Sequence, residues 1–189
     1  MRYNTHYEIG AKVKNIIYSI AVVGLAAAAP VAQAQGYNPF EIGASGGIAF
    51  PTGDLGNNTN TGYNIAVAVG FRSQFSPLAV RAEAAYNQFG IQGGGGNINI
   101  PAFTGNVEYT LPLGLGFTPY AIGGAGLYRP SVDFGGGNTG AENHFGWNVG
   151  GGVKLPLSSF NTFVEARYNS VNVNGGTLSF IPVTFGVMF

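Results

Sequence analysis

The chain has 189 residues, of which 8% are charged and 13% aromatic, and it contains 32 glycines and no cysteine. A typical soluble domain has about 25% charged residues, so this composition favours a chain that is partly in contact with lipid. The formal net charge of zero and the lack of a basic patch argue against nucleic-acid binding. The absence of cysteine excludes disulfides and cysteine-based metal sites.

The N-terminal segment has the organisation of an export signal. Two lysines precede the apolar stretch 16–29, which is too short to span a bilayer comfortably. The sequence Ala-Gln-Ala at 32–34 then supplies the small-x-small pattern of a cleavage site. We predict that residues 1–34 are a cleaved signal peptide and that residues 35–189 form one mature domain. A membrane-anchor helix is the alternative for the N-terminal segment.

The mature region alternates between apolar residues and small or polar ones with the period of a β-strand. This pattern predicts eight strands of about ten residues, the length that a tilted membrane-spanning strand needs. The expected strands are residues 40–50, 63–72, 78–89, 102–111, 117–129, 144–155, 162–171 and 181–189.

The predicted fifth strand is rich in glycine and shows the weakest alternation. We place Tyr120, Ile122 and Tyr128 on its apolar face, although Leu127 breaks this pattern, and Arg129 on the opposite face. Aromatic residues at the strand ends predict two interfacial girdles. The girdle on the side of the long connections comprises Phe50, Tyr63, Tyr86, Phe103, Tyr128 and Phe145. The girdle on the side of the short connections comprises Phe40, Phe71, Tyr109, Tyr120 and Phe189.

The connections between the predicted strands alternate in length. Long connections rich in glycine and asparagine follow the first, third, fifth and seventh strands, and short ones follow the second, fourth and sixth. This alternation is typical of outer-membrane barrels, whose short turns face the periplasm and whose long loops face outward. The sequence therefore predicts an all-β fold, an eight-stranded antiparallel up-and-down transmembrane β-barrel, because only a closed barrel pairs every backbone group within the bilayer.

Charged residues of the predicted strands fall on the face opposite the apolar one, as expected for a barrel with lipid outside and a polar lumen. Buried charges are tolerated when they are paired and hydrogen-bonded. We therefore expect a structural ion-pair network in the lumen. Its expected members are Glu41, Arg72, Arg81, Glu83, Glu108, Arg129, Lys154, Glu165 and Arg167. A narrow pore for water, ions or small solutes is the alternative, because glycines on the inner face leave room for water.

Residues 35–189 resemble the small eight-stranded outer-membrane barrels of the OmpA/OmpX type. The resemblance rests on the signal region, on "FTPYAIGGAGLY", on "VRAEAAYN" and "VEARYN", and on the terminal "IPVTFGVMF". It implies a location in the outer membrane of a Gram-negative-type bacterium, in contact with outer-membrane lipid. It also implies that Phe185, Val187 and Phe189 form a membrane girdle and a terminal signal read by the barrel-assembly machinery. The resemblance does not indicate an activity, because one fold hosts many functions.

Features that would indicate catalysis or cofactor binding are weak. His144 is the only histidine of the mature region, with Glu142 nearby in the sequence and Ser131 or Ser170 expected at the same rim. Lipid A modification with these residues is a distant alternative. The glycine runs lack the helix and the Lys-Ser/Thr pair of a phosphate loop, and no metal-ligand spacing is present. We expect no catalytic residue, cofactor or metal, and a structural role or a role in surface contacts through the outer loops.

Overall fold

The computed structural model describes residues 38–114, 116–135, 138–157 and 160–189, and every structural statement below concerns these residues. The predicted signal peptide, residues 1–34, lies outside them. Within the described residues, no helix has the length and the apolar character needed to cross a bilayer.

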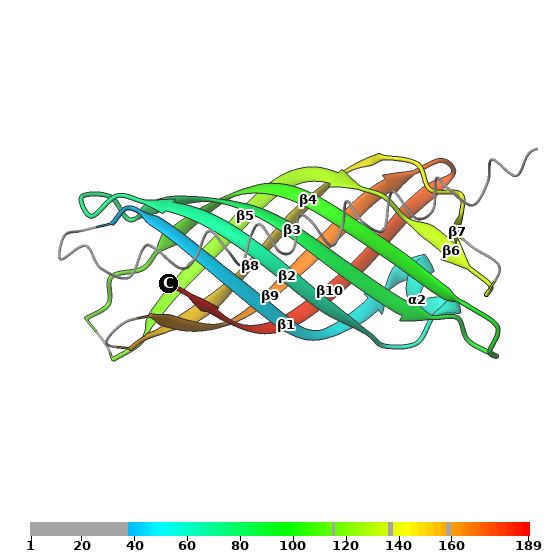
Figure 1. Ribbon diagram of the computed structural model, residues 1–189, viewed down its shortest axis with the longest axis horizontal. Coiled ribbons are helices and arrows are strands. Elements are labelled where there is room, and N and C mark those ends of the chain that lie inside the picture. The colour runs from blue at the N-terminus through cyan, green and yellow to red at the C-terminus, as the bar shows by residue number, and fades with distance from the viewer. Residues whose placement is uncertain (1–37, 115, 136–137, 158–159) are drawn as a thin grey trace, which may run out of the picture. The chain divides into compact units, whose positions relative to one another are not determined.

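Eight long antiparallel strands form a closed barrel (Figure 1), which confirms the predicted fold class. The long strands are β1 (Phe40–Thr52), β2 (Gly62–Arg72), β3 (Leu78–Gly90), β4 (Asn97–Thr110), β5 (Thr118–Tyr128), β8 (His144–Pro156), β9 (Asn161–Val173) and β10 (Gly176–Met188). Each long strand pairs with its neighbours in the sequence, and β1 pairs with β10. This order is the up-and-down topology, which leaves no unpaired edge along the barrel wall.

The barrel wall shows the alternation expected of a strand with lipid on one side. In β2, Tyr63, Ile65, Val67 and Val69 are 45–54% exposed, while the residues between them are buried in the lumen. The exposed apolar residues continue around the barrel, and Phe40 and Phe71 meet edge to face with their ring centroids 5.4 Å apart. Because exposing this much apolar surface to water is unfavourable, the outer wall fits a lipid environment.

The register of β5 differs from our expectation. Tyr120, Ile122 and Tyr128 are at most 3% exposed and point into the lumen, whereas Leu127 is 54% exposed on the outer wall. The two tyrosines therefore belong to neither girdle. The physical reason is space, because Tyr120 pairs with Gly152 on β8, which has no side chain to compete for the lumen. Large side chains lying across adjacent glycines are a known device of curved sheets.

The connections on the long-loop side contain more regular structure than the sequence indicated. The strands β3 and β4 extend until only residues 91–96 connect them, and β9 and β10 are joined by Asn174 and Gly175. The connection after β1 forms a short helix, α2 (Gly53–Asn58), and the connection after β5 adds β6 (Ser131–Asp133) and β7 (Asn138–Thr139). The ring of exposed apolar side chains on the outer wall is the apolar belt. The barrel continues as paired strands beyond this belt, on the side that also carries α2 (Figure 1).

The last residue closes the barrel. Phe189 and Ile42 exchange two backbone hydrogen bonds, from Phe189 N to Ile42 O at 2.8 Å and from Ile42 N to Phe189 O at 3.0 Å. The Phe189 side chain is 65% exposed on the outer wall, and its ring lies 5.5 Å from that of Phe160. The terminal strand therefore completes the hydrogen-bond ladder with its final residue, as the alternation of "IPVTFGVMF" predicts.

Candidate functional site in the barrel lumen

Four charged side chains meet in the middle of the lumen and form the central ion-pair cluster. Arg167 places Nη2 2.5 Å from Glu83 Oε1 and Nε 2.7 Å from Glu165 Oε1. Arg81 pairs with Glu165, and its Nε lies 3.9 Å from Glu83 Oε2. None of the four is more than 7% exposed. The hydroxyl of Tyr120 adds a hydrogen bond to Glu165 Oε2 at 2.7 Å.

The topology explains why these residues meet. Arg81 and Glu83 are two residues apart on β3, and Glu165 and Arg167 are two apart on β9, so each pair points to the same side of its strand. The strands β3 and β9 are four positions apart in a ring of eight, which places them on opposite sides of the lumen. An eight-stranded barrel is just narrow enough for such side chains to meet across its interior.

A second group of charges, the rim ion-pair cluster, lies nearer the end that carries the chain terminus. Arg72 pairs with Glu108 and, at 3.3 Å from Nε to Oε1, with Glu41. Lys154 Nζ lies 2.7 Å from Glu108 Oε1. The Arg72 and Glu41 side chains are 22% and 17% exposed, so this cluster has more access to solvent than the central one.

The two clusters together contain eight of the nine residues expected in the lumen network. Arg129 is the exception, and its expected place was wrong. It follows the last residue of β5, is exposed, and forms no ion pair with a described residue. The cause is the inverted register of β5, because an inward Tyr128 turns the next residue to the outer wall.

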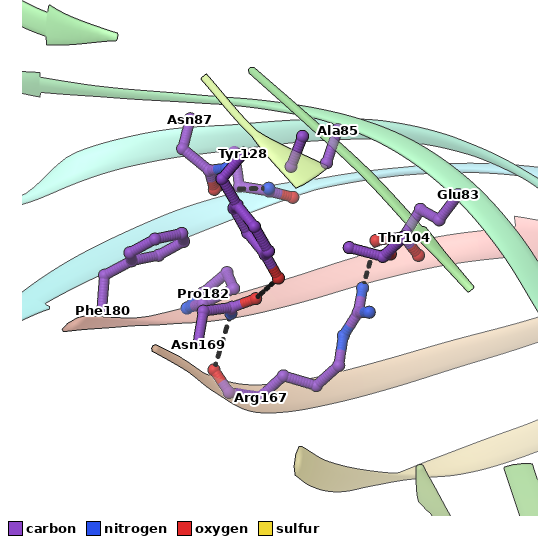
Figure 2. Close-up of a pocket in the computed structure, with 11 residues that line it drawn as sticks. Glu83, Ala85, Asn87, Thr104, Tyr128, Arg167, Asn169, Phe180 and Pro182 are labelled. Carbon is purple, nitrogen blue, oxygen red and sulfur yellow. Dashed lines mark hydrogen bonds and ion pairs between the residues drawn. The ribbon is translucent and has the colours of Figure 1, made fainter. Parts of the chain in front are cut away.

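Amide and hydroxyl side chains fill the lumen on the outer side of the central cluster (Figure 2). Asn64 donates to Asn87 Oδ1 at 2.8 Å, and the Tyr128 hydroxyl donates to Asn169 Oδ1 at 2.9 Å. These side chains border a small pocket with a volume of about 10 Å³. That space holds about one water.

Two apolar clusters close the lumen on either side of this polar middle. The outer plug consists of Ala49, Leu55, Phe89, Ile100, Tyr128, Val171 and Phe180. The inner plug consists of Ala68, Tyr120, Ile122, Phe163 and Met188. Most of these residues come from strands, but Leu55 comes from α2, which inserts its only buried side chain, 2% exposed, into the outer plug. A segment predicted as a long connection between strands therefore helps to close the lumen.

The plugs are joined to the charges by stacking contacts. The guanidinium carbon of Arg81 lies 5.7 Å from the centre of the Phe163 ring, and Lys154 Nζ lies 5.2 Å from that of Tyr120. Such cation–π contacts hold a cation in a defined position. The described part of the lumen is thus filled by alternating apolar and charged layers.

The residues considered for catalysis do not form a site. His144 is partly exposed on the lumen-side register of β8, beside Tyr128, and Ser131 and Ser170 are buried. Glu142 accepts a hydrogen bond from Asn174 Nδ2 at 3.4 Å. Among the described residues, no hydrogen bond or ion pair joins His144 to Glu142 or to either serine, and no three potential metal ligands cluster.

Comparison with known proteins identifies the class of protein. The model of the outer membrane protein beta-barrel domain matches residues 19–189. The chain therefore belongs to this family of outer-membrane barrels, and its location is the outer membrane. No curated protein matches the sequence.

One solved structure supports the same fold, and two others are similar to a lesser degree. Neisserial surface protein A (NspA) superposes with a TM-score of 0.68 at 19% identity, covering 82% of this chain and 98% of that one. Ail of Yersinia pestis, in complex with the heparin analogue sucrose octasulfate, gives 0.49 at 17% identity and covers 80% and 100% of the two chains. The outer membrane enzyme PagL also gives 0.49, at 16% identity, covering 79% and 98%. At 19% identity, the likeness to NspA shows the fold alone.

Proposed function

We propose that the protein is a non-enzymatic outer-membrane barrel with a structural role, or a role in surface contacts, carried by its outer end. The observation that carries this proposal is the filled lumen. Two apolar plugs enclose the central ion-pair cluster, and the pocket beside that cluster has room for about one water. A closed, rigid barrel holds its outer loops in place, and loops on a rigid scaffold commonly carry function.

The outer end supplies the surface for such contacts. It consists of the 91–96 turn, α2, β6 and β7, and it carries Phe134, which is 68% exposed. The backbone N–H of Gly135 donates to Asp133 Oδ1 at 2.8 Å, which fixes the turn that presents the Phe134 ring. Exposed aromatic residues are common anchors of protein contacts.

The proposal is tested by separating the outer end from the barrel. Replacing residues 91–96 by a shorter glycine–serine turn, or Phe134 by alanine, should leave heat-modifiable gel migration unchanged. Cell-surface adhesion or outer-membrane integrity should change in cells that carry these variants. If both cellular properties stay at the wild-type level, the outer end has no such role.

A narrow pore is the second candidate, favoured by the polar middle of the lumen. Among the described residues, Arg81 Nε and Asn148 Oδ1 are buried without a hydrogen-bond partner, which favours bound water in this region. Passage would require both plugs to move. Conductance that falls when Glu83 or Arg81 is replaced by glutamine would favour the pore over the closed barrel.

Lipid A modification is tested by the mass of lipid A from cells with and without the protein. We expect identical lipid A, because His144 has no hydrogen-bonded carboxylate or serine among the described residues. A mass change that the His144→Ala variant abolishes would replace our proposal with an enzymatic one.

During biogenesis we propose the barrel-assembly machinery as a partner, recognised through the terminal strand. Phe185 and Phe189 are 58% and 65% exposed on the outer wall, and Val187 lies between them on the same face. This exposed stripe is available to a binding partner before the barrel is embedded in lipid.

A further inference from the structure

The outer wall changes from apolar to polar over three neighbouring rows of side chains near the outer end of β3, β4 and β5. In the first row Phe103 pairs with Leu127, and both side chains are more than half exposed, at 62% and 54%. In the next row Tyr86 pairs with Pro101, whose carbonyl accepts a hydrogen bond from the Arg129 backbone at 2.8 Å. Arg129 therefore lies one step outside the apolar belt.

The third row is polar. Gln88 pairs with Asn99, which pairs with Ser131 on β6. The Gln88 amide donates to Asn99 Oδ1 at 2.8 Å, so the buried Asn99 fixes the amide of the partly exposed Gln88. Tyr63, 45% exposed, pairs with Gln88, and its ring centroid lies 6.3 Å from that of Tyr86. Arg129 thus lies in the same row as Tyr86, with Pro101 between them, at the boundary of the belt.

Arg129 differs from the other described cations in its exposure. Of the lysines and arginines in the described part of the chain, Arg72, Arg81, Lys154 and Arg167 all pair with carboxylates in the lumen. Arg129 alone is exposed on the outer wall, so it is the described cation that can reach a ligand there.

We propose that Arg129 binds the phosphate of a lipid in the outer leaflet, with the Tyr63–Tyr86 pair and the amide of Gln88 forming the neighbouring surface. A guanidinium group presents a fork of donors that matches phosphate geometry. Tyrosine rings belong at the level of lipid headgroups, where one end is apolar and the other wet. The site is continuous with the apolar belt, so a lipid whose chains lie on Phe103 and Leu127 would bring its headgroup to Arg129.

The nearby acid limits where the phosphate can lie. Asp133 pairs with Asn97, one row further from the belt than Asn99 and Ser131, and its Oδ1 accepts from Gly135 N. A phosphate is repelled on that side and attracted by Arg129 on the membrane side. This arrangement favours a lipid headgroup next to the belt over a soluble anion that approaches from the aqueous side.

The test measures lipid retention by native mass spectrometry of the full-length barrel in detergent. The probes are diphosphorylated lipid A and the same lipid with its phosphates removed. Arg129→Gln should weaken binding of the phosphorylated lipid about fivefold, the effect of one basic residue near an anionic surface. Arg129→Lys should retain most of the binding, because the charge remains. Binding of the dephosphorylated lipid should be equal in all variants.

The control variant is Asp54→Asn, which changes one exposed charge at the same end on α2, an element whose main-chain neighbours are β1 and β10 rather than β3, β4 or β5. We expect it to change binding less than twofold, and heat-modifiable migration shows that each variant is folded. Equal binding of the phosphorylated lipid by the wild type and Arg129→Gln would overturn the proposal. So would an equal loss of both lipids in Arg129→Gln. Neither result would bear on whether the lumen is closed.

Discussion

Arg167 on β9 and Glu83 on β3 meet across the lumen, with 2.5 Å between Nη2 and Oε1, although 84 residues separate them in the sequence. The contact spans the barrel because β3 and β9 lie on opposite sides of the ring. The contact links two strands that share no backbone hydrogen bonds, so the central ion-pair cluster connects opposite sides of the barrel.

Arg167→Met should destabilise the barrel strongly. The substitution leaves Glu83 and Glu165 buried with Arg81 as their remaining ion-pair partner among the described residues, and breaking a buried ion pair costs about 3–5 kcal/mol. Urea unfolding in detergent micelles measures this, with the fluorescence of Trp147, the chain's single tryptophan, as reporter. The exposed arginine offers the control, because Arg129→Met should change the unfolding free energy by about 0.5 kcal/mol or less. Equal effects of the two substitutions would contradict a structural role for the cluster.

Gly152→Ala should be costly, although the change is small. A Cβ at Gly152 would clash with the backbone carbonyl oxygen of Val164 and lie 2.6 Å from the Tyr120 hydroxyl oxygen, which holds the Glu165 carboxylate. We expect a loss of about 1–3 kcal/mol, the usual effect of overpacking. Gly105→Ala is the matched control, since a Cβ there meets nothing within 4 Å. The same unfolding experiment decides, and tolerance of Gly152→Ala would contradict the tight packing of Gly152 against Val164 and Tyr120.

Leu55→Ala should release α2 from the outer plug. Truncating a buried leucine costs about 2 kcal/mol or more, which corresponds to roughly thirtyfold more of the open helix. Limited proteolysis within residues 53–58 measures this opening while the strands stay protected. Leu113→Ala, at a side chain that is 59% exposed, should leave cleavage unchanged. An unaltered cleavage rate in Leu55→Ala would show that α2 does not depend on this contact.

Phe189→Ala, or a short charged extension after Phe189, should impair assembly more than stability. The side chain is 65% exposed and the backbone bonds to Ile42 remain, so the folded barrel loses about 1 kcal/mol. The steady-state level in the outer membrane should nevertheless fall. Phe103→Ala removes an equally exposed ring, at 62%, from an internal strand and should leave that level unchanged. Normal levels of both Phe189 variants would refute the role of the terminal residue in assembly.

The sequence predicted the barrel well because lipid imposes a strict pattern on a strand. Outward residues must be apolar and charges must point inward, so the period-two alternation of strands such as β2 and β3 defines both faces. Pairs such as Arg81 and Glu83 then follow from spacing alone. Which carboxylate each arginine meets depends on the order and stagger of the strands, so the sequence could not predict it.

The fifth strand was assigned the wrong register because the lumen also holds apolar side chains. Tyr120 and Tyr128 could belong to a lipid-facing girdle or to a plug, and periodicity cannot separate the two in a strand rich in glycine. A usable signal was Leu127, which fits the lipid face only if the tyrosines point inward. The glycines of β8, such as Gly146 and Gly152, support the same register because they leave room for both tyrosine rings in the lumen. The misplacement of Arg129 followed from the same error.

The outer connections were harder to predict because their glycine and asparagine content is typical of loops. Residues 97–101 nevertheless continue β4, since strands already paired in the membrane extend by adding further ladder bonds. Similarly, α2 is too short to form alone, and burial of Leu55 supplies its stability. Tertiary contacts decide both cases, and the local sequence does not contain them.

Single-channel recording in planar bilayers shows whether the lumen is filled. The purified barrel, inserted at known density, should give no reproducible conductance steps, because the two plugs and the central ion-pair cluster block the path. Regular steps of constant size from the wild-type protein, reduced in Glu83→Gln or Arg81→Gln, would contradict the closed barrel and establish a pore.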